Sequence, residues 1–134
     1  MGSDTSANYD VFIRDGKTRA TRLVSRSSAE LQGEAASYSP PVSSGGRFVV
    51  FTSDSTNLIP SDTNGIQEIF LRDRKLGITI RVSVTSAGGQ ADDYSIEATI
   101  SADGRYVAFL SGATNLVGSD TNAIVDAYIR GPLF

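Results

Sequence analysis

Side chains that carry oxygen recur at a fixed spacing in this chain. Asp62, Asn64 and Glu68 stand at positions i, i+2 and i+6. Calcium-binding loops use oxygen ligands at spacings of this kind, with a glycine for the turn, here Gly65. The pattern returns further along the chain, and in a sparser form near its start, at Asp120, Asn122, Asp126, Asp4, Ser6 and Asp10. These side chains are the candidate cation ligands.

A second interpretation of the same residues needs no metal. The pattern lacks a third acid near its start and the distal bidentate glutamate of the EF-hand loop. Asp and Asn side chains also close their own turns, and the acids Asp10, Glu68 and Asp126 can anchor the next segment through backbone bonds. We favour this structural interpretation. We therefore predict no cofactor and no metal, with calcium as the cation of the alternative.

A short acidic patch, Asp92-Asp93-Tyr94 with Glu97, is the other candidate site. It belongs to a long connection, residues 85–95, and long loops often carry function. One interpretation is a surface that faces a ligand, and the other is a solvated loop, which is the usual state of an isolated charge cluster. Paired carboxylates can hydrolyse glycosides, but nothing in this sequence marks either acid for a raised pKa.

The composition excludes several kinds of chemistry. The 134 residues include no histidine and no cysteine, which rules out Ser-His-Asp and Cys-His catalysis and histidine-ligated metal sites within one chain. The net charge of −3 argues against a general nucleic-acid binder. No apolar stretch approaches the roughly 20 residues of a membrane span. We predict a non-catalytic chain with neither nucleic acid nor membrane as a partner.

A period of 58 residues organises the sequence. The string SDTSANYDVFIRD begins at Ser3, SDTNGIQEIFLRD at Ser61 and SDTNAIVDAYIRG at Ser119. The units 3–60 and 61–118 are identical at about 40% of positions, and 119–134 is a partial third unit of one structural domain. Residues 1–2 match nothing in the repeat, so we interpret them as a start added to an excised or designed piece. We expect no signal peptide in this chain.

Each unit has the pattern of four short antiparallel strands, which we call types A to D. Stretch 105–111 is apolar on both faces and rich in β-branched and aromatic residues, as expected of a strand between two layers. Tight turns are predicted at 43–46, 73–77 and 101–104, and long connections at 85–95 and 112–125. The strands are expected at 39–43 and 97–101 (A), 47–51 and 105–111 (B), 10–14, 68–72 and 126–130 (C), and 21–25 and 79–84 (D).

Four-stranded units repeated at this period are typical of β-propeller blades. The pattern SADGRYVAFLS…SDTNAIVDAYIR also resembles the TolB-type, WD-like propeller repeat, from Ser3 to Arg130. Gly45 departs from the turn aspartate of that pattern, and Gly131 departs from the residue that matches Asp73. The resemblance implies an all-β propeller and no single activity. Such proteins are often periplasmic or extracellular, and the sequence leaves the localisation of this one open.

The strand order C-D, A-B-C-D, A-B-C describes one whole blade between two incomplete ones. A propeller closes with roughly 4–8 blades, and a blade needs neighbours on both faces. We therefore expect copies of the chain to join head to tail into a ring, as a trimer of six blades or a tetramer of eight. Because 10–14 and 126–130 are both C strands, we predict that one of them is displaced or unpaired.

A structural or interaction scaffold is the role that follows from this arrangement. The alternative function is a lectin-like or peptide-binding ring that uses its loop faces, and the absence of tryptophan counts against sugar stacking. The alternative architecture is an incomplete monomer or dimer taken from a larger parent.

Overall fold

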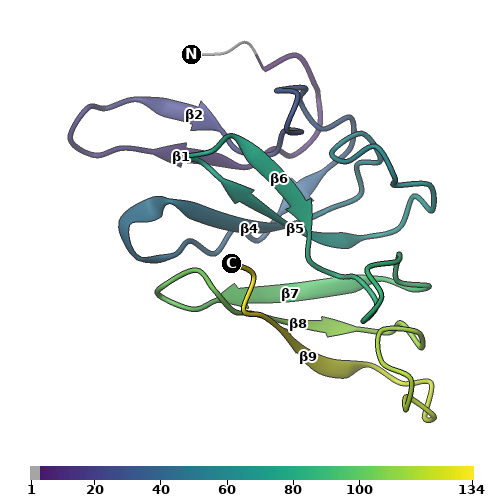
Figure 1. Cartoon of the computed structure of the whole chain (residues 1–134). Coiled ribbons are helices and arrows are strands. Elements are labelled where there is room, and N and C mark those ends of the chain that lie inside the picture. The colour runs from purple at the N-terminus through teal and green to yellow at the C-terminus, as the bar shows by residue number, and fades with distance from the viewer. Residues whose placement is uncertain (1–3) are drawn as a thin grey trace.

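The computed structural model describes residues 4–134, so the interpretation of residues 1–2 and the first residue of the first unit lie outside it. Nine strands form three antiparallel sheets in this part of the chain (Figure 1). The all-β prediction is confirmed. No helix in residues 4–134 is long and apolar enough to cross a membrane. The strands are β1 (Phe12–Arg14), β2 (Thr21–Leu23), β3 (Ser37–Tyr38), β4 (Phe48–Ser53), β5 (Glu68–Asp73), β6 (Ile78–Arg81), β7 (Ser95–Ile100), β8 (Val107–Ser111) and β9 (Asp126–Arg130).

The sheets follow the order of the sequence. The first holds β1 and β2, the middle sheet runs β3-β4-β5-β6, and the last runs β7-β8-β9. Each strand of the middle sheet pairs with its sequence neighbour, as in a propeller blade. This matches the predicted order, because the first sheet supplies types C and D and the last sheet supplies A, B and C.

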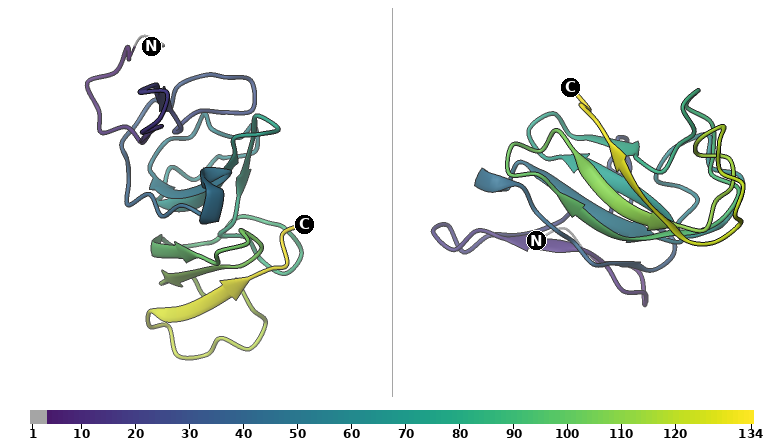
Figure 2. Two further views of the ribbon diagram at one scale, coloured as in Figure 1. Left: turned by 90° about the vertical axis from the view of Figure 1, so that its left-hand side faces the viewer. Right: turned by 90° about the horizontal axis from the view of Figure 1, so that it is seen from below.

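The three sheets stack face to face, with the first and last sheets at opposite ends (Figure 2). One apolar core, which includes Val50, Leu71 and Phe109, lies between the middle and last sheets. A second core, which includes Phe51 and Phe70, contains residues of the first and middle sheets. Successive side chains of β4 enter different cores, since neighbours along a strand point to opposite faces. This alternation explains why the strand is apolar on both sides.

The first A strand is not where the sequence predicted it. We expected 39–43, but β3 pairs Ser37 and Tyr38 with Thr52 and Ser53. The ladder stops at Ser39, which has a left-handed backbone (φ 52°), and residues 40 and 41 are prolines without an N–H to donate. The matching strand β7 starts two residues before the predicted 97, and its register shifts between Ile96 and Thr99, where Glu97 has the same left-handed backbone. A bulge of this kind is invisible to a search for alternation.

Candidate functional site

The candidate cation loop at Asp62, Asn64 and Glu68 lies against the guanidinium group of Arg81, at the end of β6. Glu68 begins β5 and is fully buried, and Nη1 of Arg81 donates to both of its carboxylate oxygens at 2.8 and 3.0 Å. The amide of Asn64 donates to the same carboxylate at 3.4 Å. Arg81 therefore supplies the positive charge that a bound cation would bring. No group of three or more Asp, Glu, His or Cys side chains in residues 4–134 is arranged to hold a metal ion.

The corner around Glu68 is rich in buried negative charge. The pKa of Glu68 is raised to about 7, mainly by burial and also by the nearby Asp62, while the hydrogen bond and charge of Arg81 act in the opposite direction. Asp62 is itself buried, and both of its carboxylate oxygens lack a hydrogen-bond partner among the described residues. Glu68 is thus paired with a guanidinium, and the neighbouring buried carboxylate of Asp62 is not.

The third copy of this loop, which begins at Ser119, is built differently. Asp120 Oδ1 accepts from the N–H of Asn122 at 3.3 Å, and Asn122 Oδ1 accepts from the N–H of Ile124 at 3.1 Å. These are the Asx-type turns of the structural interpretation. The second carboxylate oxygen of Asp120 accepts from the hydroxyl of Tyr128 at 3.0 Å. Asp126 lies half-buried at the start of β9.

In the first copy, the acid at the end of the string fastens a strand to its neighbour. Asp10 Oδ1 accepts from Ser25 Oγ at 2.8 Å, and the same hydroxyl accepts from the N–H of Val11 at 3.1 Å. In the middle unit Ser83 Oγ likewise accepts from the N–H of Ile69, at 3.0 Å. This serine clamp ties strand C to strand D in both units.

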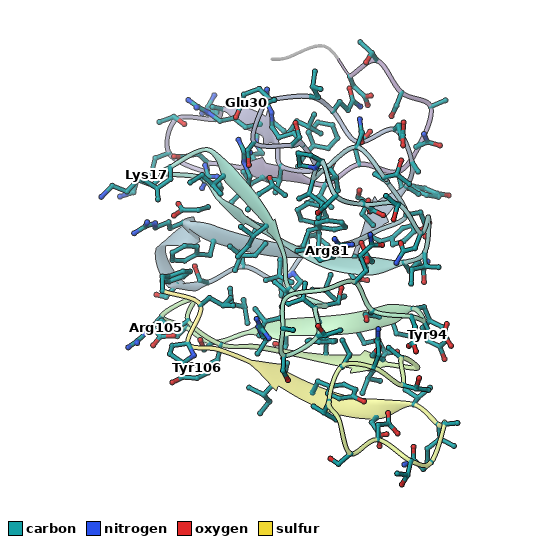
Figure 3. All side chains as sticks on the ribbon, turned by 45° about the vertical axis from the view of Figure 1, so that its right-hand side comes forward. Lys17, Glu30, Arg81, Tyr94, Arg105 and Tyr106 are labelled. Carbon is teal, nitrogen blue, oxygen red and sulfur yellow. The ribbon has the colours of Figure 1, made fainter. Side chains whose placement is uncertain are left out.

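The acidic patch in the long loop is also held by bonds within the chain. Asp92 accepts from the N–H and the hydroxyl of Thr114, at 2.7 and 2.6 Å, and these bonds hold the pKa of Asp92 below its usual value. Asp93 accepts from the N–H of Tyr94 at 2.8 Å. Figure 3 places Tyr94 on the opposite side of the molecule from Arg105. Asp92 therefore joins two loops, and the patch stays a prediction as a ligand surface.

A hollow of about 1150 Å³ was not anticipated from the sequence. It lies between the β1–β2 hairpin and the turn after β5. Its only acid among the described residues is Glu30, which forms ion pairs with Arg26, at 2.7 Å, and with Arg72. The basic side chains that line it are Arg14, Arg19, Arg22, Arg26, Arg72, Arg74 and Lys75. They come together from segments about 50 residues apart, which no local pattern reveals. The hollow can attract anions.

The outer faces of the two end sheets are not covered by another sheet. Repeat-equivalent residues can therefore be compared with and without a neighbouring sheet. Leu71 in the middle sheet is 2% exposed, whereas Ile129, at the same repeat position in β9, is 76% exposed. At the other end of the stack, Phe12 is 39% exposed while its counterpart Phe70 is completely buried. Equivalent residues thus lack a cover only where the stack of sheets ends.

An arginine of strand C bridges each pair of neighbouring sheets. Arg72 Nη1 donates to the carbonyl of Ser27 at 2.9 Å, and Arg130 Nη1 donates to the carbonyl of Thr85, the repeat equivalent of Ser27, at 3.5 Å. The third member of this set is Arg14, which is exposed and donates to Thr21 in its own sheet at 3.0 Å. Two of the three periodic arginines thus tie neighbouring sheets together. Arg14 stands where a preceding blade would contribute its carbonyl.

A second ion pair occurs in only one of the sheets. Arg47, just before β4, donates to Asp73 at the end of β5 at 3.0 and 2.7 Å. In the last sheet the arginine is Arg105, but Gly131 replaces the acid, and Arg105 Nε donates to the backbone carbonyl of Phe134 at 3.1 Å. In the first sheet the acid is Asp15, and it forms no ion pair within residues 4–134. Each end sheet holds one half of the pair.

Comparison with known proteins supports the fold. No family model matches this chain, and no curated protein matches it. Among solved structures it is similar to TolB from Acinetobacter baumannii, with a TM-score of 0.56 at 17% identity. The match covers 96% of this chain and 26% of that one, so the chain spans about a quarter of its length. The predicted resemblance to a TolB-like β-propeller is confirmed for the fold, and the excised or designed origin stays a prediction.

Proposed function

We propose that this chain is a non-catalytic propeller unit that joins copies of itself head to tail into a closed ring, as a structural or interaction scaffold. The observation that carries the proposal is the loss of cover at the two ends of the stack, where Phe12 is exposed and Leu110 of β8 is half-buried, whereas their middle-sheet equivalents Phe70 and Thr52 are buried. Removing one such side chain from water contributes about 1.5–3 kcal/mol. A blade-like partner is what covers these positions elsewhere in the chain.

Charge also differs between the two ends. Residues 12–23 of the first sheet carry four basic side chains and one acidic one, whereas residues 86–134 carry six acidic and two basic ones. Opposite charge at the two ends favours head-to-tail contact and disfavours contact between like ends. Such a contact is heterologous, so it forms a closed ring only if the rotation per chain completes a circle.

Closure sets the number of chains. Each chain contributes two blades, so the roughly 4–8 blades of known propellers correspond to small rings. A trimer gives six blades and a tetramer gives eight. The expected mass in solution is three or four times 14.2 kDa.

Light scattering behind a sizing column tests the proposal. Leu110 lies on the outer face of β8, at the repeat position of the buried Thr52, and any head-to-tail joint covers this face. We expect the unmodified chain to run as a single closed species and Leu110→Asp to run as a monomer. Leu76→Asp is the control, because Leu76 is exposed in a turn of the middle sheet. A mass of 14.2 kDa for the unmodified chain at every concentration would contradict the proposal.

A second candidate function is the binding of polyanions, and the basic hollow is the observation that favours it. Arg22 takes the repeat position of Ile80, which packs against the core, so the fold does not need an arginine there. Guanidinium groups bind phosphate, sulfate and carboxylate through paired hydrogen bonds. We expect Arg22→Ile to weaken the binding of labelled dextran sulfate, measured by fluorescence anisotropy. Lys17→Ile removes one charge outside the lining and is the control, and equal losses in both variants argue against the hollow.

A further inference from the structure

We infer that β9 is a temporary occupant of its place in the last sheet, and that in the assembled ring β1 of the next copy replaces it. The joint blade then consists of β7 and β8 of one chain and the β1–β2 hairpin of the next. The inference rests on the proposed self-association and concerns how the joint is made. It identifies the edge of β8 that β9 vacates as the binding surface and the hairpin of a second copy as its partner.

One C strand must leave because a blade has only one place for it. Within a single chain both are paired, β1 with β2 over three residues and β9 with β8 over five. The predicted unpaired strand is therefore absent from the isolated chain, and the conflict arises only when two ends meet. When the hairpin arrives, β1 and β9 compete for the edge of β8.

The residues of β1 fit the complete blade better than those of β9. In the middle sheet, strand C places Phe70 in a core and ends in Asp73, which pairs with Arg47. Strand β1 keeps both features, with Phe12 and Asp15 at these positions. Strand β9 keeps only the first, because Tyr128 packs against the core but Gly131 stands where the acid would be.

An ion pair at the end of strand C can form in the joint blade only if β1, and not β9, lies beside β8. Arg105 has no acid to pair with in its own sheet, and Asp15 has no arginine in its own. Replacement of β9 by β1 brings these two side chains to the relative positions that Arg47 and Asp73 have in the middle sheet. An aspartate at 131 is not an alternative, since a Cβ there would lie 2.5 Å from the carbonyl oxygen of Arg105.

The clamp between the first two strands favours entry of the hairpin as one unit. Val11 and Asp10 both bond to the hydroxyl of Ser25, and the N–H of Val24 donates to the carbonyl of Val11 at 2.7 Å. In the alternative arrangement β9 stays in its sheet and only β2 of the next copy pairs with it. That arrangement would break the bonds that tie β2 to residues 10 and 11. If the hairpin joins β8, they persist. The chain then loses the β8–β9 ladder, the bond of Arg130 to Thr85 and the contacts of Tyr128. A β8–β1 ladder replaces the first, and Arg14 and Phe12 stand at the repeat positions of Arg130 and Tyr128.

A disulfide lock tests the exchange in the full chain, which has no cysteine of its own. Ala108 faces Ile129 across the β8–β9 ladder. We expect the variant Ala108→Cys with Ile129→Cys to be monomeric when oxidised, because β9 cannot leave, and to assemble like the unmodified chain when reduced. A second lock, Leu110→Cys with Ala127→Cys, uses the next facing pair on this face of the ladder. An oxidised lock that still assembles overturns the inference, since β9 then stays in place in the ring.

Substitutions that need no cross-link give an independent answer. Ile129→Glu is expected to leave the ring mass unchanged, because β9 is released, whereas retention of β9 would bury that charge and break the ring. Asp15→Arg and Arg105→Asp are each expected to weaken assembly at least tenfold, and the double variant to restore much of the loss. No restoration, or loss of the ring in Ile129→Glu, counts against the exchange. Failure of self-association itself appears differently, as a monomeric unmodified chain.

Discussion

At the residue scale, the same position has different surroundings in each copy of the repeat. The C-strand acid is bound by Arg81 in the middle unit and by Ser25 in the first unit. Leu23 occupies the position of Arg81 in the first unit, so an arginine is unavailable there. The sequence predicted that these acids anchor strand C through backbone bonds, whereas Asp10 accepts from side chains, including the Ser25 hydroxyl. It could not predict the partner, because the partner comes from another strand.

Glu68 makes folding stability depend on pH in a defined direction. Its pKa is raised to about 7 from 4.5, so the native state holds its proton more tightly than the unfolded chain does. This contribution to the free energy of unfolding is fully present below pH 4.5 and is lost as the pH rises through 7. We expect a loss of about 3 kcal/mol across this window. Urea unfolding at pH 5 and pH 8, at one fixed protein concentration, measures it.

Glu68→Gln is expected to flatten that dependence, since an amide does not ionise. Glu97→Gln is the control, because Glu97 is an exposed acid of β7. The carboxylates with lowered pKa values, such as Asp73, act in the opposite direction but mainly below pH 5. A free energy of unfolding that is equal at pH 5 and 8 in the unmodified chain would show that Glu68 titrates normally.

Arg19 has a backbone conformation better suited to glycine. Its φ is 61°, and the equivalent residue of the middle unit is Gly77, with φ 70°. A left-handed conformation costs a residue with a Cβ about 1 kcal/mol. We expect Arg19→Gly to raise the free energy of unfolding by about 0.5 kcal/mol. Ala20→Gly, which has no positive φ to relieve, should lower it, and thermal melts of the two variants in opposite directions would support this account.

At the scale of the strands and turns, the tight turn between types A and B depends on one close contact. Gly104 has φ 77°, and a Cβ on it would lie 2.2 Å from the ring of Phe48 in the middle sheet. We expect Gly104→Ala to destabilise the chain by about 2–4 kcal/mol, through strain and displacement of that ring. Gly118→Ala is the control, since its site is open. Denaturant unfolding should separate the two variants clearly, and equal midpoints would mean that the turn adapts.

At the scale of the whole molecule, assembly links stability to concentration. A chain that is stabilised by its neighbours melts at a higher temperature when it is more concentrated. We expect Tm to rise by roughly 3 °C for each tenfold increase in protein concentration. In Leu110→Asp, which cannot cover the outer face of β8, Tm should be independent of concentration. A constant Tm in the unmodified chain would indicate a monomer whose end sheets are stable alone.

The period, the all-β class, the four strand types and their order along the three sheets could all be predicted from the sequence. Alternation and turn residues encode these features locally, which is why β9 agrees with its predicted range residue by residue. Contacts between residues far apart in the sequence became visible only in the folded chain. It pairs Glu68 with Arg81, gathers arginines from separate segments around one hollow, and leaves Ile129 exposed where Leu71 is buried. The first depends on the neighbouring strand of the same sheet, and the other two depend on which sheet lies opposite, so equivalent strands acquire different surroundings.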